Sequence, residues 1–317
     1  MNRIIVLGIF IFLGYGAFGQ QKSISITIDD VPNTLKFHDD GFRSVLLERL
    51  DSVDIPFTIF INESRIFQNE IAEKNKMLLV RWIAHRNSSI GNHGFSHLRY
   101  SEVGFDRFVE DVQKGSVLSD SIASHYGKSI GSFRFPFNDL GKDSTQQVQI
   151  KEYLKASDGQ IAPFTVESSD WMFDSVYCYY LEKEEYEKAK ELGELYVAKT
   201  MELLSFFEGM AEEIYGRPIS QIYLCHDNGI NADYLPELVS ALRNEGYEIV
   251  GFEDSMKDPV YSQDDKYNQK WGVSWLYRWM QTQEERVQWM KQEPDLTEIQ
   301  QLFEKVSDSG NLSDKLN

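Results

Sequence analysis

The feature that most constrains the fold is a series of short apolar runs that alternate with longer, charged, helix-like segments. The runs are 24–28, 57–61, 89–91, 132–135, 161–166, 222–225 and 248–251. Strands that alternate with helices form right-handed crossovers and a parallel sheet. Because ionisable residues directly follow several runs, we expect a distorted (β/α) barrel of about seven parallel strands with a site at their carboxyl ends. An open, doubly wound sheet is the alternative.

Two segments depart from this alternation. Residues 177–217 carry apolar side chains at three- and four-residue spacing, which predicts an amphipathic helical insertion that packs on the barrel wall, with a lid over the site as the alternative. Residues 258–317 form a polar, Trp-rich C-terminal extension whose last residues, 307–317, we expect to be disordered. Trp271, Trp275 and Trp279 recur at helical spacing, which favours an aromatic stripe docked on the barrel over a sugar-stacking platform.

The first nineteen residues are typical of a cleaved secretory signal. Arg3 precedes an apolar run over 4–13, and Ala17 and Gly19 suit a cut before Gln20. The run is shorter than the roughly 20 residues of a membrane-spanning helix. We therefore expect a periplasmic or extracellular protein without a membrane span, whose main domain covers residues 20–257.

The charge balance restricts the class of partner. Lys and Arg total 32 against 50 Asp and Glu, which gives a net charge of -18 and disfavours nucleic acid as a partner. A neutral or sugar-like partner is favoured. The two cysteines exclude a disulfide scaffold, and the position of Cys225 in an apolar run predicts a buried thiol. Nothing in the sequence indicates an oligomeric state.

Three candidate metal ligands follow the first and third runs. Asp29 and Asp30 directly follow the first run and offer the one carboxylate ligand, although such a pair also caps turns. His93 and His97 are four residues apart, a spacing that puts both imidazoles on one face if the segment is helical. Two imidazoles and one carboxylate leave open coordination positions, as in a catalytic metal site.

Three further groups of polar and aromatic residues follow later runs. Taken singly, an Arg on a strand is often a salt-bridge partner, a Trp usually belongs to the core, and a lone His is usually hydrogen-bonded in the interior. Their shared place after predicted strands favours a functional site. They are Arg134, Pro136 and Phe137, then Glu167, Asp170 and Trp171, and finally Leu224 and His226.

These five motifs, in this order over residues 23–255, resemble those of the polysaccharide deacetylase family, the family 4 carbohydrate esterases with a NodB-homology domain. The resemblance implies Asp29 as the catalytic base and Asp30, His93 and His97 as the ligands of a divalent metal. It also implies His226 as the general acid.

The same resemblance assigns the remaining residues. Arg134 orients the base, and the Phe137 backbone N–H helps to hold the oxyanion. Glu167 or Asp170 tethers the general acid, and the choice between the two stays open. Substrate contacts are implied for the remaining motif positions, Trp171, Leu224 and Pro136.

Four positions depart from the family pattern and suggest an outlying branch. Val31 and Asn138 replace glycines, Gly94 replaces the Ser or Thr after the first His, and Glu167 replaces an Asp. None of these changes removes an ionisable role.

The expected function is that of an exported, metal-dependent hydrolase that removes N- or O-linked acetyl groups from a carbohydrate. Zinc is the expected ion, and cobalt, nickel or iron also suits the ligand set. A carbohydrate-binding protein on a decayed enzyme scaffold and a hydrolase of other C–N bonds are the alternatives.

Overall fold

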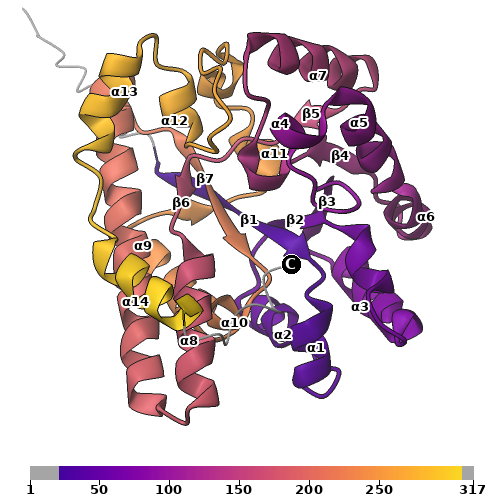
Figure 1. The fold of residues 1–317 in the computed structure, drawn as a ribbon. Helices are drawn as coiled ribbons and strands as arrows, with labels where there is room; N and C mark the ends of the chain where they lie inside the picture. Colours follow the sequence, from indigo (N-terminus) through magenta and orange to yellow (C-terminus); the bar gives the residue numbers. More distant parts are fainter. Residues whose placement is uncertain (1–20, 309–317) are drawn as a thin grey trace, which may run out of the picture.

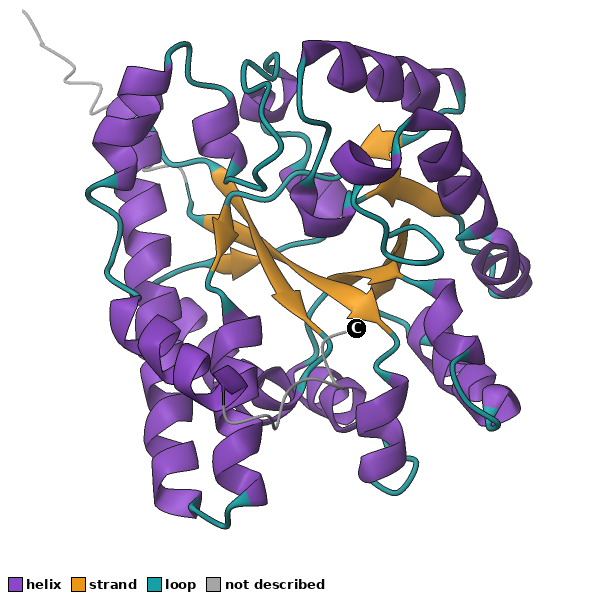
Figure 2. Cartoon of the chain, viewed as in Figure 1, coloured by secondary structure: helices purple, strands orange, loops and turns teal. Residues whose placement is uncertain are grey.

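A curled parallel sheet lies at the centre of the molecule, with helices around it (Figure 2). The computed structural model describes residues 21–308. The strands are β1 (Ser23–Val31), β2 (Phe57–Ile61), β3 (Ser88–Asn92), β4 (Ile130–Phe133), β5 (Gln160–Ile161), β6 (Val166–Glu167), β7 (Ser220–His226) and β8 (Glu248–Ile249).

The strand order is β5-β4-β3-β2-β1-β7-β6, and β8 pairs with β1 at the start of that strand. Every pairing in the described part of the chain is parallel. β1 is buried over most of its length, with three isoleucines that alternate with Ser and Thr, as expected of a strand covered on both faces. The predicted α/β fold, a distorted barrel, is confirmed.

The barrel is open between β5 and β6, where a single strand over 161–166 was predicted. Pro163 interrupts that run, and because proline has no N–H it cannot continue a ladder. The chain crosses the opening instead: Ala162 N–H donates to Phe133 O at 2.8 Å, and Thr165 N–H donates to Ile222 O at 2.9 Å. The described residues therefore form eight strands, one more than predicted.

Fourteen α-helices and three 3₁₀ turns occur in the described residues (Figure 1). The helices are α1 (Thr34–Asp39), α2 (Val45–Val53), α3 (Ala72–Ala84), α4 (Tyr100–Val103), α5 (Phe105–Lys114), α6 (Val117–His125), α7 (Ser144–Ala156), α8 (Asp170–Glu182), α9 (Tyr186–Tyr215), α10 (Gly229–Asn244), α11 (Phe252–Ser255), α12 (Trp275–Arg278), α13 (Gln283–Met290) and α14 (Thr297–Asp308). The 3₁₀ turns are η1 (Glu63–Phe67), η2 (Pro136–Asn138) and η3 (Pro259–Ser262).

The predicted helical insertion is the pair α8 and α9, which lie side by side next to β6 (Figure 1). The pair begins at Asp170, seven residues before the predicted boundary of 177. Leu203, Phe207 and Met210 of α9 join the same apolar core as the strands. The insertion thus packs on the barrel wall, as expected.

The C-terminal extension lies against the opening of the barrel. Trp275 N–H donates to Phe164 O at 2.9 Å, and Ser274 Oγ donates to Thr165 O at 2.7 Å. Trp275 and Trp279 are buried in the main core, so the docking predicted for the aromatic stripe is confirmed for them. It is wrong for Trp271, which is 58% exposed.

The two chain ends fall largely outside the described residues. α14 includes Ser307 and Asp308, so these two residues are helical and not disordered. The rest of the predicted disordered tail and the predicted signal peptide lie outside the described residues. Within residues 21–308, no helix combines the length and the hydropathy needed to cross a bilayer. Cys225 is buried and forms no disulfide, as expected.

Candidate active site

The predicted site residues converge at the carboxyl ends of the strands. Asp29 and Asp30 lie near the carboxyl end of β1. His93 directly follows β3, and Arg134 directly follows β4. His226 ends β7, and the pairing of β1 with β7 places it beside Asp29. Residues from well-separated parts of the chain thus meet at one end of the barrel, as in other barrel sites.

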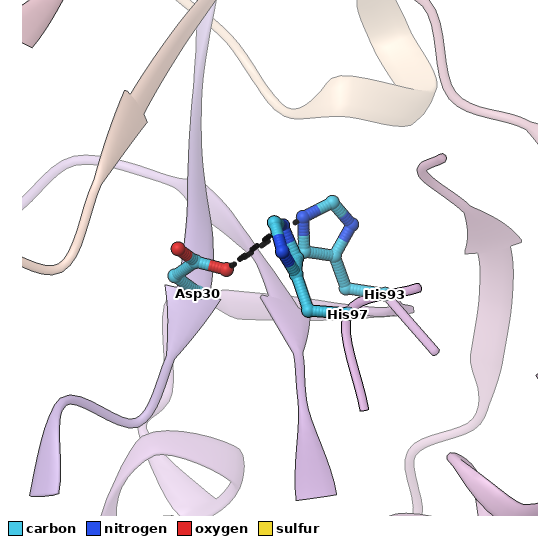
Figure 3. Close-up of side chains that lie close together, drawn as sticks. All are labelled: Asp30, His93 and His97. Carbon is cyan, nitrogen blue, oxygen red and sulfur yellow. Dashed lines mark ion pairs between the residues drawn. The ribbon is translucent and has the colours of Figure 1, made fainter. Parts of the chain in front are cut away.

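Asp30, His93 and His97 form the one group in the described residues whose side chains could hold a metal ion (Figure 3). Asp30 Oδ1 lies 3.8 Å from His93 Nε2 and 3.5 Å from His97 Nε2. These separations suit atoms that each lie about 2 Å from a shared ion. Asp30 Oδ1 is also buried and accepts no hydrogen bond from the described residues. Because a buried carboxylate oxygen needs a partner, this donor set fits a divalent cation.

The protonation states suit metal binding. Burial lowers the pKa of both His93 and His97 to about 4, so both imidazoles are neutral near pH 7. Burial would raise the pKa of Asp30, but Arg65 and the neighbouring imidazoles outweigh it and hold that pKa well below its usual range. His93 Nδ1 lies 2.8 Å from Arg134 O, so the Nδ1–H donates to this carbonyl and Nε2 stays available as a ligand.

The two imidazoles are brought together by a loop, not by the helix that their spacing predicted. Gly94 and His97 both have positive φ, 77° and 55°, and the loop returns the chain so that the ring centroids are 5.0 Å apart. Asp111 holds this loop by accepting hydrogen bonds from Phe95 N–H and Ser96 N–H. A Cβ on Gly94 would lie 2.8 Å from Asp111 Oδ2, which explains why the Ser or Thr of the family pattern is absent.

Arg65 is a site residue that the sequence reasoning missed. It lies in η1 after β2, and its Nη2 is 2.9 Å from Asp30 Oδ2. The guanidinium thus contacts one carboxylate oxygen of Asp30 and leaves the other facing the imidazoles. The available signal was its position shortly after a predicted strand.

Asp29 is buried beside Arg134. Arg134 Nη1 lies 3.7 Å from Asp29 Oδ2, and Arg134 Nη2 donates to Thr27 Oγ1 and Pro163 O. Burial raises the pKa of Asp29 above its usual value, and the positive charge of Arg134 opposes this shift. Asp29 Oδ1 accepts no hydrogen bond from the described residues, so it is available to accept a proton.

Asp170, at the start of α8, is the partner of His226. Asp170 Oδ1 lies 2.6 Å from His226 Nδ1, and Asp170 Oδ2 accepts from His226 N–H at 2.8 Å. Asn231 Nδ2 donates to Asp170 Oδ2 at 2.6 Å, and Tyr196 of α9 donates to Asn231 Oδ1 at 2.6 Å. Sequence reasoning missed Asn231 and Tyr196, which no motif singles out.

Glu167 does not occupy the tethering position. Its Oε1 accepts from Ser169 N–H at 2.6 Å. Burial, reinforced by the nearby charge of Asp170, raises the pKa of Glu167 to about 7. The question that the sequence left open is thereby answered in favour of Asp170.

The other predicted residues border this group. Phe137 lies in η2 with a positive φ of 57°, and its ring packs on His97 with centroids 4.4 Å apart. The oxyanion contact of its N–H stays a prediction. Trp171 is 42% exposed and contacts Phe303 of α14. Leu224 and Pro136 are buried, and their contact with substrate stays a prediction.

Comparisons with known proteins agree with this geometry. The model of the polysaccharide deacetylase family matches residues 18–154, which contain the first three motifs. No curated protein matches the chain.

Solved structures show the likeness in fold. A family 4 carbohydrate esterase pseudoenzyme of Bacillus anthracis is 15% identical over 75% of this chain and 66% of its own, with a TM-score of 0.50. A mutant of that pseudoenzyme with restored enzymatic activity is 17% identical over 75% of this chain and 68% of its own, also with a TM-score of 0.50. The peptidoglycan deacetylase PdaC of Bacillus subtilis is 18% identical over 75% and 92%, with a TM-score of 0.45. The resemblance carried by the motifs is therefore confirmed: residues 18–154 match the model of the polysaccharide deacetylase family, and the fold is similar to that of the family 4 carbohydrate esterase pseudoenzyme.

Proposed function

We propose that the chain is an exported, metal-dependent deacetylase that hydrolyses N- or O-acetyl groups of a poly- or oligosaccharide. The observation that carries this proposal is the convergence of a metal-binding donor set, a buried carboxylate and a carboxylate-held imidazole at one end of the barrel. The net charge of -18 is compatible with a neutral sugar substrate and disfavours a polyanionic one.

Asp30, His93 and His97 would hold the metal ion. When bound in such a site, a divalent ion polarises a carbonyl and lowers the pKa of water. Zinc suits two imidazoles and a carboxylate best, and cobalt, nickel and iron are the other candidates.

Asp29 and His226 would move the protons. Water adds to the acetyl carbonyl carbon while Asp29 accepts a proton from that water. The bond between the acetyl carbon and the sugar nitrogen or oxygen then breaks. His226 Nε2 gives a proton to the leaving amine or alkoxide, and acetate is the other product. The Phe137 N–H would donate a hydrogen bond to the oxyanion that forms between these steps.

The charge state of His226 supports its role as the acid. Burial would lower its pKa, but the charge of Asp170 and the hydrogen bond to it outweigh burial and raise the pKa to about 10. The imidazole is therefore protonated at neutral pH, as a general acid must be. Export is proposed from residues 1–19, which lie outside the described part of the chain.

The test is acetate release by the mature chain from residue 20 onward. Chitooligosaccharides, peptidoglycan fragments and acetylated xylan would be assayed with and without added zinc, cobalt, nickel or iron. We expect release from at least one of them that depends on metal and is lost in Asp29→Asn. Tight glycan binding without acetate release under any metal condition would instead favour the decayed, binding protein. Hydrolysis of a cyclic amide without deacetylation would favour a hydrolase of other C–N bonds.

A further inference from the structure

A pocket of about 310 Å³ lies between the end of β6 and the C-terminal extension. Phe164, Phe207 and Met290 supply apolar walls, and Glu167 and Glu293 supply carboxylates. Apolar walls with a few polar groups are typical of pockets for small ligands, and the volume is at the lower end of their range. The family motifs assign no role to the part of this pocket that the extension contributes.

Two of the residues that line the pocket, Glu167 and Gly272, connect it to the candidate active site. Glu167 is three residues before Asp170, and its partner on β7 is Leu224, two residues before His226. On the other side, the lining residue Gly272 packs directly on the turn that holds Phe137. A Cβ at Gly272 would lie 2.2 Å from Phe137 O, so only glycine permits this approach.

Trp271 directly precedes the lining residue Gly272 in the chain. It is 58% exposed, while the next two tryptophans of the extension, Trp275 and Trp279, are buried. Lys270 Nζ lies 4.9 Å from the centre of the Trp271 ring. An exposed aromatic ring offers a flat apolar surface for the C–H face of a sugar, and the carboxyl groups that line the pocket can accept hydrogen bonds from sugar hydroxyls.

We propose that Trp271 and this pocket form a subsite for a second, neutral or amino-bearing sugar residue, next to the residue that is deacetylated. The proposal rests on the proposed function and deepens it: the substrate is a chain of at least two sugar residues. The two carboxyl groups select the class of sugar, because they can accept hydrogen bonds from hydroxyl or ammonium groups, whereas a uronic acid would add a third acidic group beside Glu167 and Glu293. The C-terminal extension thereby takes part in substrate selection as well as covering the opening of the barrel.

The first experiment compares Trp271→Ala and Glu293→Gln with the wild-type chain on an N-acetylated monosaccharide and its tetrasaccharide. We expect each variant to raise KM for the tetrasaccharide about two- to tenfold and to leave the monosaccharide kinetics unchanged. Tyr186→Ala is the matched control, since Tyr186 is an exposed aromatic at the start of α9. An unchanged KM for the tetrasaccharide in both pocket variants would overturn the subsite.

A second experiment separates failure of the subsite from failure of the proposed function. Calorimetry would measure binding of the tetrasaccharide to the wild-type chain and to Trp271→Ala, so the readout is binding and not turnover. Wild-type binding that Trp271→Ala weakens supports the subsite even if no acetate is released, in which case only the deacetylase function fails. Equal binding by both chains, or no binding by the wild-type chain, refutes the subsite whatever the activity.

Discussion

His226 Nδ1 lies 2.6 Å from Asp170 Oδ1, and the backbone N–H of His226 donates to the second oxygen of the same carboxylate. Asn228 and Asn231 donate to that second oxygen as well. Burial would raise the pKa of Asp170, but its contacts with His226 and Asn231 outweigh burial and lower that pKa. The carboxylate therefore stays charged, fixes the ring through Nδ1, and leaves Nε2 as the atom that can give a proton to substrate.

Neutralising Asp170 should move the alkaline limb of activity. The general acid works only while it is protonated, so the rate falls as pH rises through the pKa of His226, which Asp170 raises to about 10. In Asp170→Asn the pKa falls, and the limb of a kcat/KM profile should shift to lower pH. Glu167→Gln should leave this limb in place because Glu167 binds Ser169 N–H. A larger shift in Glu167→Gln than in Asp170→Asn would contradict the assignment.

Asp29→Asn and His226→Ala should each retain metal and glycan binding but lose about 10²–10⁴-fold in kcat, the usual contribution of a positioned proton-transfer group. Asp29 Oδ1 accepts no hydrogen bond from residues 21–308, and the amide of Asn in its place cannot take up the proton of water. Steady-state kinetics with measured metal content would check this. Full activity in either variant would remove that residue from the mechanism.

The purified mature chain should carry about one divalent ion, and His97→Ala should lose it while keeping its fold. His97 lies on a partly exposed loop outside the apolar core, so its replacement by Ala should leave the packing of the core, and thus the fold, intact. Elemental analysis and circular dichroism would measure the two outcomes, with His125→Ala on α6 as a histidine control away from the ligand set. A metal-free wild-type chain with chelator-resistant activity would disprove the metal site, and global unfolding of His97→Ala would mark the pair as structural.

The sequence was sufficient for most of the strands and for the order of the motifs, because most strands overlap a predicted run and each motif lies at or just after the carboxyl end of a strand. It was insufficient where distant segments meet. Arg65 reaches Asp30, and Tyr196 reaches Asn231, through side-chain contacts between different elements, and no periodicity encodes such contacts.

Local backbone geometry was the other source of error. The spacing of His93 and His97 indicated a shared site correctly, but the loop achieves it with positive φ at Gly94 and His97, which a helix-based argument does not anticipate. Pro163 divided one predicted strand into two, and the turn at Gly272 keeps Trp271 out of the buried aromatic stripe. These three differences lie in loops and turns, where the chain path is not set by a regular helix or strand.

The last prediction concerns the buried network behind His226. The Tyr196 hydroxyl lies 2.8 Å from Tyr223 Oη and donates to Asn231 Oδ1 at 2.6 Å, with both tyrosines fully buried. Tyr196→Phe removes the donor to Asn231 Oδ1 and leaves the Tyr223 hydroxyl with Ser168 Oγ as its remaining partner, so it should lower the free energy of unfolding by about 1–3 kcal/mol. Urea denaturation would measure this, with Tyr186→Phe as a control whose exposed hydroxyl should leave stability unchanged. Because Asn231 would hold Asp170 less firmly, the alkaline limb of Tyr196→Phe should also move to lower pH, by less than in Asp170→Asn. Stability and pH profile both equal to those of the wild-type chain would show that the network does not support His226.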